Sequence, residues 1–157
     1  MEELLTHLKS HWKNLRGRTY DFLDVLKQED LTKKLPFPAS QSIYYQLDCI
    51  LGTTETIVDF MKTEKKTKWH CSLPNGVTDM PIATIKKHLQ KSDKVLFATL
   101  DKADLLKKQQ DSTTPLQKYM NLVEHESHHH GQLINFIYAL DLAIPQSWAE
   151  IWELKKN

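Results

Sequence analysis

The spacing of apolar residues constrains the fold of this chain more than any other feature of its sequence. Four long segments repeat apolar side chains at intervals of three and four residues, the spacing of one face of an α-helix. Short breaks rich in proline or polar residues separate these segments, and no segment sustains the alternation of a strand. Four helices with short connections bury their apolar stripes best against one another. The sequence therefore predicts an all-α protein, a four-helix bundle with a short C-terminal helical tail.

The breaks also give approximate limits for the helices. Ser40 or Ser42 is suited to cap the second helix, and Thr114 followed by Pro115 is typical of a helix start. Trp148 and Trp152 lie one turn apart in the tail, which we expect to pack back on the bundle. The predicted helices cover residues 2–28, about 40–62, 81 to about 106, and 113 to about 144.

The stretch between the second and third helices, residues 63–80, is charged and irregular. It is long for a loop in a compact domain, and such loops are functional lids or mobile segments. Both alternatives remain open from the sequence.

Length and charge narrow the class of protein. A chain of 157 residues is expected to form one domain, residues 1–157, with a substantial core. Its net charge of +1 gives no reason to expect nucleic acid or a membrane as a partner. The N-terminus lacks a signal-peptide pattern, and the two cysteines, Cys49 and Cys71, make a poor disulfide framework. We therefore expect a cytoplasmic protein with reduced thiols.

Four of the eight histidines lie within six residues of the last long helix. Residues four apart stack about 6 Å from each other on one helix face, so His125 and His129 can reach one metal ion. This pair lies on a flank of the apolar stripe, whereas His128 points toward solvent. Glu126 and His130 lie nearer the centre of the stripe. The flank pair is the best candidate for metal ligands.

Single histidines near a core are usually hydrogen-bonded structural residues, but four histidines within six residues are less ordinary. Gly131 follows the cluster directly, and a glycine inside a helix often marks close approach of a neighbouring element. The combination favours a metal-binding or catalytic role for the cluster.

Residues 125–129 also match H-E-x-x-H, the zinc-peptidase motif in which the glutamate, here Glu126, is the general base. The chain offers no edge strand to hold a peptide and no third ligand at the spacing of such enzymes. A zinc peptidase is therefore the less favoured interpretation.

A longer pattern, H-E-x-x-H-H-G-Q-L from His125 to Leu133, is followed by an apolar run, Ile144-Pro145 and Trp148. It resembles the last helix of the DinB/YfiT-like superfamily, and the chain length and order of helices are similar as well. The resemblance implies a helical bundle whose divalent metal is held by three histidines, two of them matching His125 and His129. It also implies a metal-dependent enzyme that uses a low-molecular-weight thiol, often as a homodimer.

The chain departs from that family in its second helix, where Gln46 stands at the position of the third histidine. An amide oxygen is a weaker ligand than imidazole for Zn, Ni or Fe. Gln46 could bind the metal through oxygen or hold a water on it. Alternatively, Cys49 or His70 could supply the third ligand, or the metal could have been lost.

Three protein ligands would leave an open position on the metal, as in catalytic sites. Such a metal lowers the pKa of a water or thiol, and Glu126 and Gln132 could orient the imidazoles from behind. The sequence thus favours a metal-dependent transferase or hydrolase acting on a small molecule, with Cys49 an inert buried thiol unless it binds the metal. The alternative is a non-catalytic dimeric bundle, a binding or stress-related protein with a degenerate site.

Overall fold

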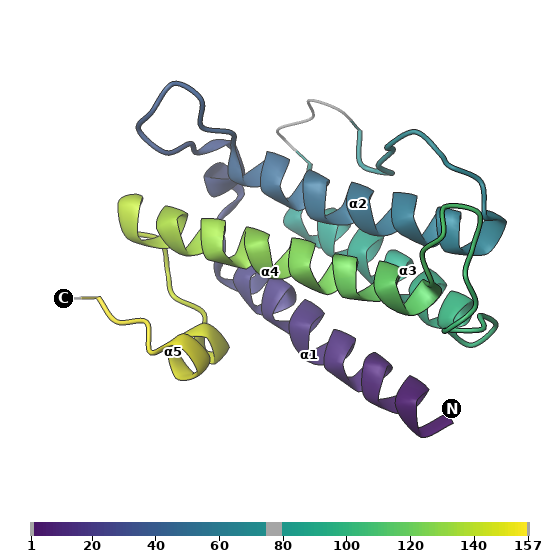
Figure 1. Ribbon diagram of the computed structural model, residues 1–157. Coiled ribbons are helices and arrows are strands. Elements are labelled where there is room, and N and C mark those ends of the chain that lie inside the picture. Colours follow the sequence, from purple (N-terminus) through teal and green to yellow (C-terminus); the bar gives the residue numbers. More distant parts are fainter. Residues whose placement is uncertain (1, 75–79, 157) are drawn as a thin grey trace.

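The structure, a computed structural model, describes residues 2–74 and 80–156 (Figure 1). Within these residues the chain is helical, and its only bridge between extended segments joins Lys34 and Ser42. This confirms the all-α prediction. The elements in chain order are α1 (Glu2–Val25), the 3₁₀ turn η1 (Gln28–Thr32), α2 (Ile43–Thr63), α3 (Ile82–Leu100), α4 (Pro115–Ala139) and α5 (Gln146–Trp152).

The four long helices pack alongside one another. α1 and α2 each contact both α3 and α4, and Figure 1 shows α2 and α4 running side by side. One apolar core lies at the end that holds the start of α2 and is closed by α5, and a second lies at the other end. In the described part of the chain, no helix is long and apolar enough to cross a membrane.

The helix starts agree with the local signals in the sequence. The Ser42 side chain accepts a hydrogen bond from the Tyr45 amide and so caps α2, whereas the Ser40 hydroxyl binds the Leu35 amide. Thr114 caps α4 in a reciprocal arrangement with Gln117. These contacts satisfy backbone amides that the first helical turn leaves without partners.

Three helix ends fall earlier than predicted: α1 ends at Val25 instead of Gln28, and the differences at α3 and α4 are larger. α3 ends at Leu100 instead of Leu106, because the chain turns and packs Leu105 into the core, where it is 2% exposed. α4 ends at Ala139, and the left-handed backbone at Asp141 (φ 52°) redirects the chain toward α5. The ends of α3 and α4 depend on tertiary packing that helical periodicity does not report.

The tail packs back on the bundle, as expected. The Trp148 ring is fully buried, stacks on Phe22 with centroids 5.2 Å apart, and donates its Nε1–H to the Arg18 carbonyl.

The close approach of a neighbouring element that the sequence predicted at Gly131 occurs instead at Gly52. A side chain at Gly131 would meet no atom within 4 Å, so the predicted close approach there is wrong. The close approach occurs at Gly52 in α2, where a Cβ would overlap the indole of Trp69. Trp69 thus fastens the described part of the 63–80 loop to α2, while residues 75–79 of that loop lie outside the described residues.

Candidate metal centre

A cavity of about 1050 Å³ opens between α2, α4 and the segment that precedes α2. Its wall comes from two stretches of the chain, residues 35–49 and 125–139. Gln46, Cys49, His125 and His129 all line it. The packing of α2 against α4 therefore brings the histidine pair to a cavity together with the two candidate third ligands of the second helix.

Cys49, His125 and His129 form a cluster in which one ligand atom of each lies within 4.8 Å of the others. The Cys49 Sγ lies 3.7 Å from the His125 Nε2, and the two imidazole centroids are 4.6 Å apart. Tetrahedral zinc sites place sulfur and nitrogen ligands about 3.6 Å apart. The sulfur–nitrogen spacing fits such an ion, and thiolate with two imidazoles is a donor set that zinc prefers.

Burial sets the protonation of these three groups. It lowers the pKa of His125 and lowers that of His129 to about 4, so both imidazoles are neutral near pH 7. Burial raises the pKa of the Cys49 thiol, which is therefore protonated without a metal. Neutral imidazoles are competent ligands, and the thiol must lose its proton when a cation binds.

Gln46 contacts an imidazole of the cluster directly. Its Oε1 accepts a hydrogen bond of 2.6 Å from the His129 Nδ1, which assigns the proton of that ring to Nδ1 and leaves Nε2 basic. This is the contact by which outer residues orient metal-binding histidines. Gln46 thus occupies the position where the family resemblance expects a ligand and makes the contact of an orienting residue.

His128 and Gln132 also belong to the wall of the cavity. His128 is exposed, as predicted, and its Nε2 accepts a hydrogen bond of 2.9 Å from the Gln132 amide nitrogen. His70, an alternative third ligand, bonds to Thr56 and lies 3.2 Å from the Asp59 carboxylate. These contacts assign His70 to the surface of α2 and not to the cluster.

Glu126 points away from the cavity, toward α1. Its carboxylate is 1% exposed, lies 3.1 Å from the Arg16 guanidinium and accepts a 2.5 Å hydrogen bond from Thr19. His130 donates to the same hydroxyl over 2.7 Å and packs against Trp148. The predicted role of Glu126 in orienting a ligand imidazole has no contact to support it, and its placement argues against the peptidase interpretation.

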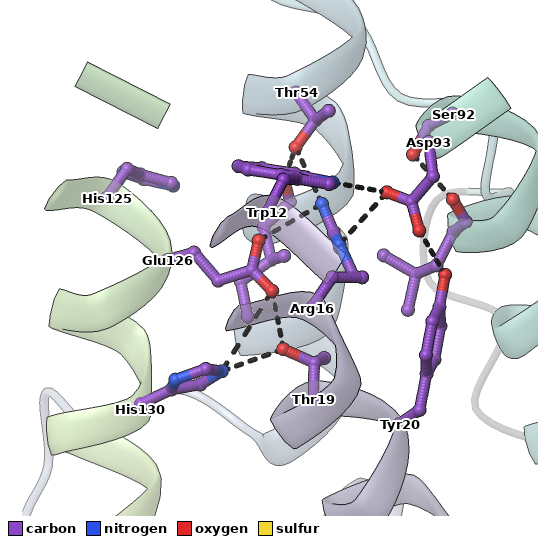
Figure 2. Close-up of polar contacts among 12 residues, drawn as sticks. Trp12, Arg16, Thr19, Tyr20, Thr54, Ser92, Asp93, His125, Glu126 and His130 are labelled. Atoms are coloured by element: carbon purple, nitrogen blue, oxygen red, sulfur yellow. Dashed lines mark hydrogen bonds and ion pairs between the residues drawn. The ribbon is translucent and has the colours of Figure 1, made fainter. Parts of the chain in front are cut away.

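Arg16 is the centre of a buried polar network that the sequence analysis missed. Figure 2 shows its guanidinium between the carboxylates of Glu126 and Asp93, with the Thr54 hydroxyl 3.0 Å away. Trp12 and Tyr20 donate hydrogen bonds to Asp93. One guanidinium therefore joins all four long helices. Its place in the sequence, one turn after Trp12 on the apolar face of α1, was the signal.

No protein-family model and no curated protein matches the chain. What the fold and the site define is a helical protein with a cysteine–histidine cluster on the wall of a cavity.

Proposed function

We propose that the chain is a metal-dependent enzyme of the DinB/YfiT-like type, a transferase or hydrolase that acts on a small molecule held in the cavity. The observation that carries this proposal is the convergence of Cys49, His125 and His129 on the cavity wall. The packing of four long helices and the position of the histidine pair on the last of them support the family assignment.

Cys49 takes the place of the missing histidine as third ligand in this proposal. It lies one turn after Gln46 on α2, and its sulfur is within 3.7 Å of His125. Gln46 is engaged with His129 instead. Thiolate and imidazole favour zinc over the harder divalent cations, so zinc is the metal we propose.

The bound metal would act as a Lewis acid and lower the pKa of a water or thiol at its open position. The residues of the chain have separate tasks around it. Gln46 holds the His129 ring through Nδ1, and the buried Glu126 anchors the helix that carries both histidines to α1. His128, exposed in the cavity wall, is placed to carry a proton between cavity and solvent.

Cobalt substitution tests this proposal, because a thiolate ligand gives cobalt(II) a charge-transfer absorption in the near ultraviolet. Protein purified without an affinity tag should bind one cobalt ion and show this band. Cys49→Ser should lose the band, whereas Cys71→Ser, at the other free cysteine, should keep it. A band that survives in Cys49→Ser, or no metal uptake by the wild type, would refute the proposed centre.

A further inference from the structure

The wall of the cavity at the cysteine–histidine cluster carries no full charge. Among the described residues, 17 line it, and none is Lys, Arg, Asp or Glu, although these types make up 26% of the chain. A wall of that size drawn at random from this composition would carry about four. The exclusion of these four residue types is a property of this cavity wall in the described part of the chain.

Among the residues that the structure describes, the absence of charged side chains is specific to the wall of this cavity, because a cavity at the opposite end of the bundle has several. A second cavity of about 770 Å³, between the ends of α2 and α3 and the start of α4, has six charged residues in its wall. These are Lys62, Glu64, Lys94, Lys102, Asp104 and Lys107. An anion brought into the first cavity would lose hydration without gaining a counter-ion from the wall.

Aromatic rings form much of the wall instead. Phe37, Tyr45 and Tyr138 all line the cavity, yet each is about half exposed, at 54%, 46% and 49%. Exposed aromatic side chains gathered around one opening are typical of a surface that receives an apolar ligand. Phe136, almost fully buried, continues this surface inward.

Uncharged polar atoms in the wall are available to a ligand. Gln41, Tyr45 and Tyr138 line the cavity, and their side chains are exposed. The amide and phenol oxygens of these side chains can accept a hydrogen bond from a ligand hydroxyl.

We propose that the cavity binds an uncharged aromatic molecule that bears a hydrogen-bond donor such as a hydroxyl group. This rests on the proposed function to the extent that the molecule would be the substrate of the metal centre. A consequence concerns the thiol co-substrate: one that carries carboxylates would find no counter-ion in this wall.

Two probes with the same ring test the charge preference, naphthalenemethanol and naphthoate. Calorimetric titration of the metal-free full chain should show the alcohol binding at least about tenfold more tightly than the carboxylate. Metal-free protein is used for the pair because a carboxylate could also coordinate zinc.

A variant that introduces a charge should bind naphthoate more tightly, and a misfolded protein would not show such a gain in affinity. Asn135→Lys places an ammonium group in the wall and should tighten naphthoate binding by about tenfold, with little effect on the alcohol. Asn121→Lys, exposed on the same helix and outside the cavity, is the matched control and should change neither affinity.

The outcomes separate this inference from the proposed metal centre. Equal or tighter binding of naphthoate by the wild type, or no binding of the alcohol, would overturn the inference whatever cobalt does. Selective binding of the alcohol by a protein that takes up no cobalt would support the inference and refute the metal centre.

Discussion

At the scale of single residues, the identity of the third ligand separates the interpretations of this site. Gln46 and Cys49 lie one turn apart on α2, and the Cys49 Sγ lies in the cluster with His125 and His129. The Gln46 Oε1 accepts a hydrogen bond from the His129 Nδ1. We therefore propose that the thiolate binds the metal and that the amide orients the His129 ring.

This division predicts the effect of Gln46→Ala. Loss of an orienting partner lowers metal affinity by about 10- to 100-fold without removing a ligand. The cobalt charge-transfer band should persist in the variant, while competition with a chelator reports the weaker binding. Gln41→Ala, at an exposed position of the same cavity, is the control and should bind metal as the wild type does. Unchanged affinity in Gln46→Ala would contradict the orienting role.

The sequence indicated the histidine pair because the distance between two residues four apart on a helix follows from their numbers alone. Cys49 could be named only as an alternative, since its distance from His125 depends on how α2 packs along α4. For the same reason Glu126 looked like a partner of the cluster, although a step of about 100° around the helix turns it toward α1.

At the scale of helices, the starts could be predicted, whereas the ends of α3 and α4 could not. Ser42 and Thr114 cap their helices through contacts within four residues, so the signal is local. The ends of α3 and α4 depend on where Leu105 and α5 find space in the core. The need for glycine at position 52 could not be predicted either, because it depends on Trp69 of the folded loop packing against α2.

The two glycines give a matched prediction. Gly131→Ala should raise the free energy of unfolding by about 0.5–1 kcal/mol, because alanine favours the helix and the space beside it is open. Gly52→Ala should lower it, because the new Cβ displaces Trp69 from α2. Urea unfolding measures both changes. Stabilisation by Gly52→Ala would show that Trp69 does not pack there.

Arg16 joins the helices through buried ion pairs with Glu126 and Asp93. Replacing it by methionine leaves the buried carboxylates of Glu126 and Asp93 without their counter-ion. Removing one partner of a buried ion pair costs about 3–5 kcal/mol. Urea unfolding of Arg16→Met should show a loss of that size, and the exposed Lys87→Ala should show almost none. A loss below about 1 kcal/mol would mean that the carboxylates are satisfied in another way.

At the scale of the whole molecule, buried neutral histidines make stability depend on pH. Burial lowers the pKa of His130 to about 3, whereas an unfolded histidine has a pKa of about 6.5. Below pH 6.5 the unfolded chain takes up a proton at His130 that the folded chain does not, so stability falls as pH falls. Glu126, whose pKa burial raises, acts in the opposite direction, so a comparison between variants is needed.

His130→Gln isolates this contribution, since the amide can still donate to Thr19. Between pH 7 and pH 5 the metal-free wild type should lose about 2 kcal/mol more stability than the variant. Urea unfolding at the two pH values measures the difference. Equal losses would indicate that His130 is protonated in the folded protein.

The fold as a whole serves to set one face of α4 against α2 and the next face against α1. The face toward α2 carries His125 and His129 to the cavity, and the face toward α1 carries Glu126 and His130 into the buried network. The central claim is that the first face, with Cys49, holds a metal ion.

X-ray absorption of the zinc-loaded protein tests that claim most directly, because it reports the ligand atoms themselves. We expect one sulfur at about 2.3 Å and nitrogen or oxygen ligands at about 2.0–2.1 Å, with the sulfur signal lost in Cys49→Ser. A zinc shell of nitrogen and oxygen alone in the wild type would contradict it.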